Sequence, residues 1–123
     1  MKNKKSLIIL MLALSFLGLF AQDKGVKEIV ISTSAQCGMC KDRIEKELAF
    51  AKGVRYANLD LETKDVTVRF REGKTTAEEI RKTISKIGYD ADEVLADPVA
   101  YEKLPACCKK GGHDQDHSQG SSH

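Results

Sequence analysis

Apolar and polar residues alternate along three short stretches of the chain, which is the pattern of half-buried β-strands. These stretches are Val26 to Ser32, Val54 to Leu61 and Val66 to Arg71. Because only the polar residues 62–65 separate the second from the third, these two predict a hairpin. A shorter stretch, Ala91 to Ala96, predicts a fourth strand that ends before Pro98.

Two other stretches carry apolar residues at helical spacing. The first stripe consists of Cys40, Ile44, Leu48 and Ala51, and the second of Ile80, Ile84 and Ile87. The run from Thr76 to Glu79 fits a capping box and predicts the start of the second helix. Gly53 and Gly88 follow the two stripes and predict where the helices end.

The predicted order over residues 26–96 is therefore β-α-β-β-α-β. Two such βαβ units predict an α+β, ferredoxin-like sandwich, in which two helices cover one face of a four-stranded antiparallel sheet. This topology places Gly88 to Asp90 beside the loop after the first strand. We expect the hairpin turn at residues 62–65, and the point where the chain leaves the domain, to lie at the opposite end.

The N-terminus has the features of a secretory signal peptide over residues 1–21. Residues 2–5 are basic and Leu7 to Phe20 is apolar, which is short for a membrane span of about 20 residues. We expect cleavage after Ala21, a short segment over residues 22–25, and a periplasmic or secreted domain. An uncleaved signal anchor is the alternative, and it too places the domain outside the cytoplasm.

Charge and composition narrow the function classes. The chain has 123 residues, enough for one small domain with appendages. Without residues 1–21 it carries 17 basic and 18 acidic side chains, and only 6% of the whole chain is aromatic. Nucleic-acid binding needs a concentrated basic face, so we expect no nucleic-acid partner. After cleavage we expect no stable membrane insertion either.

The chemistry of the chain is concentrated in Cys37-Gly38-Met39-Cys40, at the predicted junction of loop and helix. This spacing lets both sulfur atoms bind one ion, and the helix N-terminus stabilises the thiolate form that binds metal. Two thiolates favour a soft ion of low coordination number, Cu(I) above all, with Hg(II), Zn(II) or Cd(II) as alternatives. Structural zinc takes four ligands, whereas residues 26–96 offer only these two cysteines and no histidine. We therefore expect an open site that exchanges its ion.

Two other interpretations of the cysteine pair remain open. One is a short-loop disulfide without a function. The other is a thiol–disulfide oxidoreductase in which Cys37 attacks and Cys40 resolves. Thioredoxin-type enzymes place a proline against the dithiol, whereas here Pro98 and Pro105 both follow the predicted core.

Residues 26–96 resemble the heavy-metal-associated domain of copper chaperones, metal-pumping ATPases and the periplasmic mercury-binding protein. The matching features are Cys37-Gly38-Met39-Cys40, the stretch from Gly53 to Phe70, and Ile87-Gly88-Tyr89-Asp90-Ala91. The resemblance implies that one soft ion binds between the two cysteines. It also implies transfer to a partner's thiols through shared three-coordinate intermediates. We therefore expect a metal carrier or scavenger, not an enzyme, with a metal transporter or another thiol-containing carrier as its transient partner.

Three positions near the site modify this expectation. The family has Gly-Met-Thr before its first cysteine, where this chain has Ser34-Ala35-Gln36, so Ala35 leaves the space under the loop less filled. Met39 is interpreted as a surface or packing residue, with a thioether ligand as the alternative. Tyr89 matches the family's aromatic residue facing the metal. It either shields or hydrogen-bonds a thiolate, or closes the core.

Residues 97–123 are expected to form a flexible tail, because their last part is rich in Gly, Ser, Gln and Asp. The tail carries a secondary set of metal-ligand candidates, namely Cys107, Cys108, His113 and His117. Adjacent cysteine side chains diverge, so one of them paired with a histidine is the more natural chelate. The tail is long enough to fold back to Cys37 and Cys40. We hypothesise that it completes a three- or four-ligand site or binds a second ion; the alternative is a solvated tail with an oxidised cysteine pair.

Overall fold

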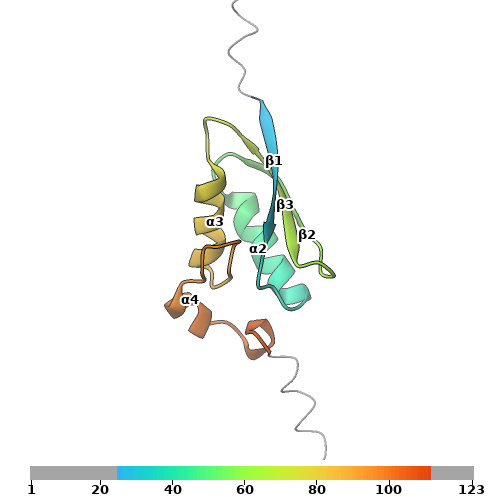
Figure 1. The fold of residues 1–123 in the computed structure, drawn as a ribbon, viewed down its shortest axis with the longest axis vertical. Coiled ribbons are helices and arrows are strands. Elements are labelled where there is room, and N and C mark those ends of the chain that lie inside the picture. Colours follow the sequence, from blue (N-terminus) through green and yellow to red (C-terminus); the bar gives the residue numbers. More distant parts are fainter. Residues whose placement is uncertain (1–24, 112–123) are drawn as a thin grey trace, which may run out of the picture.

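The computed structural model describes residues 25–111 of the chain (Figure 1). The remaining residues, 1–24 and 112–123, lie outside the described part. The predicted signal peptide and the candidate ligands His113 and His117 are among them. Within residues 25–111, no helix is both long and apolar enough to cross a membrane.

Three strands and two long helices form the body of the domain. In chain order the elements are β1 (Val26–Ser32), α2 (Gly38–Phe50), β2 (Val54–Leu59), β3 (Asp65–Arg71), α3 (Ala77–Lys86), α4 (Pro98–Glu102) and the 3₁₀ helix η1 (Ala106–Cys108). The strands pair antiparallel in the order β1-β3-β2, and α2 and α3 cover one face of this sheet (Figure 1). The predicted α+β, ferredoxin-like class is confirmed.

The two predicted helical stripes form the helix side of the core. Cys40, Ile44 and Leu48 of α2 are fully buried, and so are Ile80 and Ile84 of α3. On the sheet side the buried residues are Ile31, Leu59, Val66, Val68 and Phe70. Each such aliphatic side chain contributes about 1.5–3 kcal/mol on burial, so these stripes fix α2, and with it the cysteine loop, against the sheet.

The predicted fourth strand is not formed in the described part of the chain. Ala91 makes isolated bridges alone, one to Thr33 beside the end of β1 and one to Val94. The segment turns back because Asp92 adopts a left-handed backbone conformation, with φ 51°. In addition, the Asp90 carboxylate accepts the Ala96 N–H at 2.8 Å, which closes residues 90–96 into a loop.

The hairpin turn lies at the same end as the cysteine loop, which corrects the prediction that it is remote. Since β3 runs antiparallel to β1, the first residue of β3, Asp65, pairs with the last residue of β1, Ser32. The Lys64 carbonyl accepts a hydrogen bond from the Thr33 N–H at 3.0 Å. The Lys64 ammonium donates to the Gln36 carbonyl at 3.2 Å, so the turn supports the loop that carries Cys37.

Residues 97–110 are folded, which corrects the expectation of a flexible tail for this part of the chain; we call them the C-terminal strap. Asp97 caps α4 by accepting the Ala100 N–H at 2.9 Å. The Asp97 N–H itself donates to the Ser85 carbonyl at 3.0 Å, so the strap starts at α3. Leu104 and Cys108 join the buried core, with exposed fractions of 6% and 1%. The strap therefore starts beside α3, not at the far end of the sheet.

Replacing Leu104 by alanine tests whether the strap is part of the core. We expect Leu104→Ala to lower the free energy of unfolding by about 2–4 kcal/mol, the usual cost of a large-to-small change at a buried site. The control is Val99→Ala in the same strap, where the side chain is 65% exposed and the expected change is within about 0.5 kcal/mol. Urea unfolding of the reduced chain without residues 1–21 measures both. Equal effects of the two substitutions would contradict a packed strap.

Candidate metal centre

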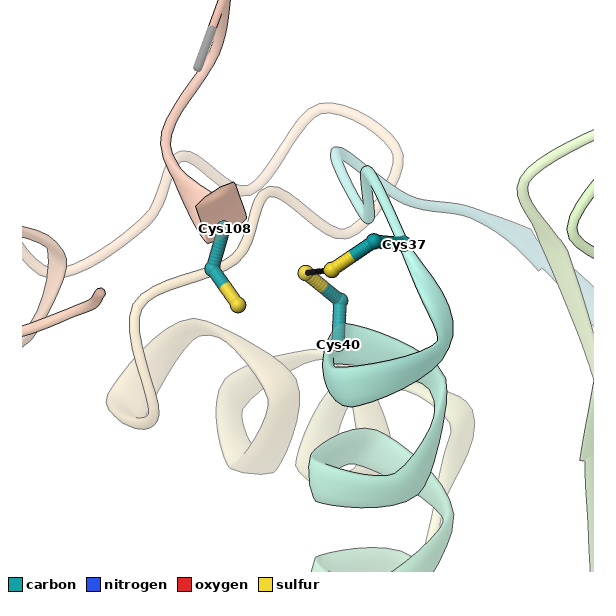
Figure 2. Close-up of side chains that lie close together, drawn as sticks. All are labelled: Cys37, Cys40 and Cys108. Carbon is teal, nitrogen blue, oxygen red and sulfur yellow. Dashed lines mark hydrogen bonds between the residues drawn. The ribbon is translucent and has the colours of Figure 1, made fainter. Parts of the chain in front are cut away.

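Cys37 and Cys40 face each other at the start of α2 (Figure 2). Cys37 is the residue immediately before the helix, and its sulfur lies 3.5 Å from the sulfur of Cys40. Cys40 is fully buried because it begins the apolar stripe of α2, whereas Cys37 is half-buried. The pair thus joins one sulfur inside the core to one that solvent reaches.

The C-terminal strap brings a third sulfur to this pair. The Sγ atoms of Cys37, Cys40 and Cys108 all lie within 4.8 Å of one another. Figure 2 shows the Cys108 side chain reaching from the strap toward Cys37 and Cys40 at the start of α2. Within residues 25–111 this is the one group of cysteine, histidine and acidic side chains that converges closely enough to hold an ion.

The other candidate residues take different places. Cys107 is half-buried and stands outside the sulfur group, as expected for the neighbour of a residue whose side chain points inward. Met39 is 49% exposed in the first turn of α2, in agreement with a surface position. Ala35 is fully buried under the loop.

Tyr89 is fully buried in the core beside the cysteines. Its pKa is raised, first by burial and then by Cys108 and Cys40, so the hydroxyl keeps its proton. Among the described residues it has no hydrogen-bond partner, since neither thiol completes a bond to it. A buried O–H donor without a partner among the described residues therefore stands next to the sulfur atoms of Cys40 and Cys108.

Side-chain hydrogen bonds fix the loop around the site. Ser34 Oγ accepts the Asp90 N–H at 2.8 Å, which confirms that the Gly88–Asp90 segment lies beside the cysteine loop. Thr33 Oγ1 accepts the Ala35 N–H at 3.2 Å. Lys64 is the supporting residue that sequence reasoning missed, because the hairpin turn was placed at the wrong end; the antiparallel pairing of β1 with the hairpin was the signal that locates it.

Comparison with known proteins identifies the domain. The family model described as "Heavy-metal-associated domain" matches residues 29–90, which is half of the chain. The chain belongs to the heavy-metal-associated domain family. The match starts in β1 and ends just after Tyr89, so it includes Cys37 and Cys40 but not the strap with Cys108.

Two curated relatives show where this domain occurs. The chain is 37% identical over 79 residues to the probable copper-importing P-type ATPase A of Enterococcus hirae, covering 62% of this chain and 11% of that protein. It is 40% identical over 55 residues to the copper-exporting P-type ATPase of Staphylococcus saprophyticus, covering 45% of this chain and 7% of that one. The chain thus spans about a tenth of the length of these relatives, and the match concerns their heavy-metal-associated domains.

Solved structures share the fold. The CopZ metallochaperone superposes with a TM-score of 0.51 at 27% identity, covering 53% of this chain and 98% of that one. The water-soluble region of the P-type ATPase CopA from Bacillus subtilis superposes with a TM-score of 0.53 at 36% identity, covering 55% of this chain and 46% of that one. Oxidized MerP from Ralstonia metallidurans superposes with a TM-score of 0.53 at 22% identity, covering 55% of this chain and 96% of that one. This likeness concerns the fold alone.

Burial and contact give the cysteines unequal acidities. Burial alone raises the pKa of Cys40, but interaction of its thiolate with the Cys108 thiol and with the Gln36 backbone brings that pKa below the ordinary value. Burial and the neighbouring Cys40 raise the pKa of Cys108 to about 12. In the reduced, metal-free protein Cys40 therefore loses its proton more readily than Cys108.

The raised pKa of Cys108 makes the free energy of unfolding fall as the pH rises above the ordinary thiol pKa. The folded chain holds the Cys108 proton more tightly than the unfolded chain, so this contribution is fully present below the ordinary thiol pKa of 9.0 and is lost as pH rises toward about 12. Over that window the free energy of unfolding should fall by up to about 1.4 kcal/mol per pH unit for one proton. The lowered pKa of Cys40 adds stability that is complete only above the ordinary thiol pKa, so just above pH 9.0 it offsets part of this fall.

Urea unfolding of the reduced, metal-free chain without residues 1–21, between about pH 9 and pH 10, measures the slope before Tyr89 contributes in the same direction. We expect Cys108→Ser to flatten it and Cys107→Ser to leave it unchanged. A slope that Cys108→Ser does not alter would contradict the assigned contact.

Proposed function

We propose that this chain is an exported soft-metal-binding protein, and that it carries or scavenges Cu(I) through Cys37 and Cys40. The observation that supports this most is the 3.5 Å approach of the two sulfur atoms at the N-terminal end of α2, within a heavy-metal-associated domain. Thiolates at that position are stabilised by the positive partial charge of the helix end.

Copper is favoured over other soft ions by two arguments. Thiolate ligands in a site of low coordination number suit Cu(I), whereas Zn(II) prefers four ligands. The two P-type ATPase relatives have names that refer to copper, and CopZ, at 27% identity, is called a metallochaperone. Hg(II) gains no support from the likeness to MerP, because at 22% identity that likeness concerns the fold alone.

We propose that delivery proceeds by thiolate exchange with a metal transporter or another thiol-containing carrier. Cys37 supports this, because it is half-buried and an incoming sulfur can reach an ion bound to it. The proposal of export is supported by the basic and apolar pattern of residues 1–21, which is typical of a signal peptide for the periplasm or for secretion. The protein then acts as a binding protein, not as an enzyme.

Anaerobic competition of the reduced chain without residues 1–21 against calibrated chelators tests the metal assignment. We expect Cu(I) to bind more tightly than Zn(II) and to resist exchange by it, with Hg(II) as the comparison that separates a copper protein from a mercury scavenger. Removing a residue that only hydrogen-bonds a metal ligand weakens metal binding by about 10- to 100-fold. Cys37→Ser and Cys40→Ser each remove a ligand itself, so we expect each to weaken Cu(I) binding by more than that. Cys107→Ser is the matched control and should retain affinity. Undiminished affinity in the Cys37→Ser, Cys40→Ser double variant would contradict the site.

The main alternative is a thiol–disulfide oxidoreductase, since a half-buried Cys37 next to a buried Cys40 is also the arrangement of an attacking and a resolving thiol. Insulin reduction by the metal-free protein separates the two functions. We expect no turnover above the background of the reductant. Turnover that Cys37→Ser abolishes would overturn the carrier assignment in favour of the enzyme.

A further inference from the structure

We propose that Cys108 is a third ligand to the carried ion, and that the C-terminal strap closes the site until a partner's thiol displaces it. This inference rests on the proposed function, because it assumes that Cys37 and Cys40 bind the ion. It goes beyond that function by making the site three-coordinate within one chain. The third sulfur comes from a segment outside the part of the chain that the family model matches.

The sulfur positions favour three ligands over two. A linear ion held by two sulfurs with bonds of about 2.3 Å, the length in zinc thiolates, needs them about 4.6 Å apart, whereas trigonal coordination needs about 4.0 Å. The Cys37–Cys40 separation is 3.5 Å, well short of the linear requirement. All three sulfurs lie within 4.8 Å of one another, so small adjustments bring them to trigonal spacing.

The strap is built to hold Cys108 at this place. A side chain at Gly88 would meet the Ala100 backbone at 3.0 Å and the Leu104 side chain at 3.1 Å, so α4 and the residues after it pack directly on that glycine. The Lys110 ammonium pairs with the Asp90 carboxylate at 2.6 Å. These contacts fix the strap on both sides of the cysteine and account for the burial of Cys108 at 1% exposure.

Polar groups around the three sulfurs suit the charge that such a site acquires. Three thiolates with one Cu(I) carry a net charge of −2, and a buried charge needs hydrogen-bond donors. The Tyr89 hydroxyl is a buried donor without a partner among the described residues, next to Cys40 and Cys108. The N-terminal end of α2 supplies further positive partial charge at Cys37 and Cys40.

The strap is also suited to open. Its helices α4 and η1 have 5 and 3 residues, far below the length at which a helix is stable by itself, so packing alone holds them. In transfer, the partner's thiol loses its proton as its sulfur bonds to the ion. The bond from the ion to Cys108 breaks, and Cys108 takes up a proton. No oxidation or reduction occurs, and the ion has three sulfur ligands both before and after the exchange.

X-ray absorption of the Cu(I)-loaded chain without residues 1–21 counts the sulfur ligands. We expect three in the wild-type protein and in Cys107→Ser, and two in Cys108→Ser and Cys108→Ala. Because serine and alanine differ in how they fill the buried site, agreement between them excludes a packing defect, and circular dichroism shows whether each variant is folded.

Release of Cu(I) to a chelator in stopped flow tests the closing role of the strap. Loss of an outer-shell partner weakens metal binding by about tenfold or more, and loss of a direct ligand should have at least as large an effect. We therefore expect Cys108→Ser to release Cu(I) about tenfold faster, or more, than Cys107→Ser. Two sulfur ligands in the wild-type protein, or equal release rates, would overturn this inference and leave the proposed function intact. A wild-type protein that binds no Cu(I) would overturn both.

Discussion

The packing of Cys108 against Cys40 is the interaction on which the rest of the site depends. Cys40 is a core residue of α2 and at the same time half of the cysteine pair, so whatever packs on it also packs on the candidate metal centre. In this chain the packing partner is another thiol. One contact therefore joins the stability of the domain to the chemistry of its sulfurs, and it gives the two thiols opposite shifts in pKa.

That contact requires a glycine and a leucine at particular places. Gly88 has a φ of 101°, which side chains rarely adopt, and it leaves room for the backbone of α4. Leu104 then fills the core next to it and directs the chain toward η1. Beyond residue 90, where the match to the family model ends, this chain adds the C-terminal strap beside its cysteine loop. If Cys108 is a third ligand as proposed, the strap favours retention of the ion over rapid exchange.

Sequence periodicity was sufficient for the body of the fold and for the cysteine pair. The apolar stripes of α2 and α3 are buried, and Thr76 caps α3 by accepting the Glu79 N–H at 3.2 Å, as the capping box predicts. These features are local, in that they depend on residues that are close together in the sequence, so a short stretch of sequence is enough to predict them. The spacing of Cys37 and Cys40 is local in the same sense, and their sulfurs do converge.

Long-range contacts account for what the sequence pattern missed. The expected fourth strand is replaced by a loop because the side chain of Asp90 bonds the backbone at Ala96, and no periodicity reports such a bond. The expectation of a flexible tail came from the composition of its last part, whereas residues 97–110 are held by Leu104 and Cys108, which are buried in the core. Cys108, and not Cys107, joins the sulfur group because of the way η1 is rotated about its axis. Packing sets this rotation, and the adjacent cysteines in the sequence do not indicate it.

Cysteine ¹³Cβ chemical shifts, followed by NMR as the reduced chain without residues 1–21 is titrated anaerobically with Cu(I), test the central claim most directly. The three converging sulfurs predict that the Cβ signals of Cys37, Cys40 and Cys108 move together, in proportion to the metal added, while that of Cys107 stays in place. Signals of Cys37 and Cys40 that do not respond to Cu(I) would contradict the account.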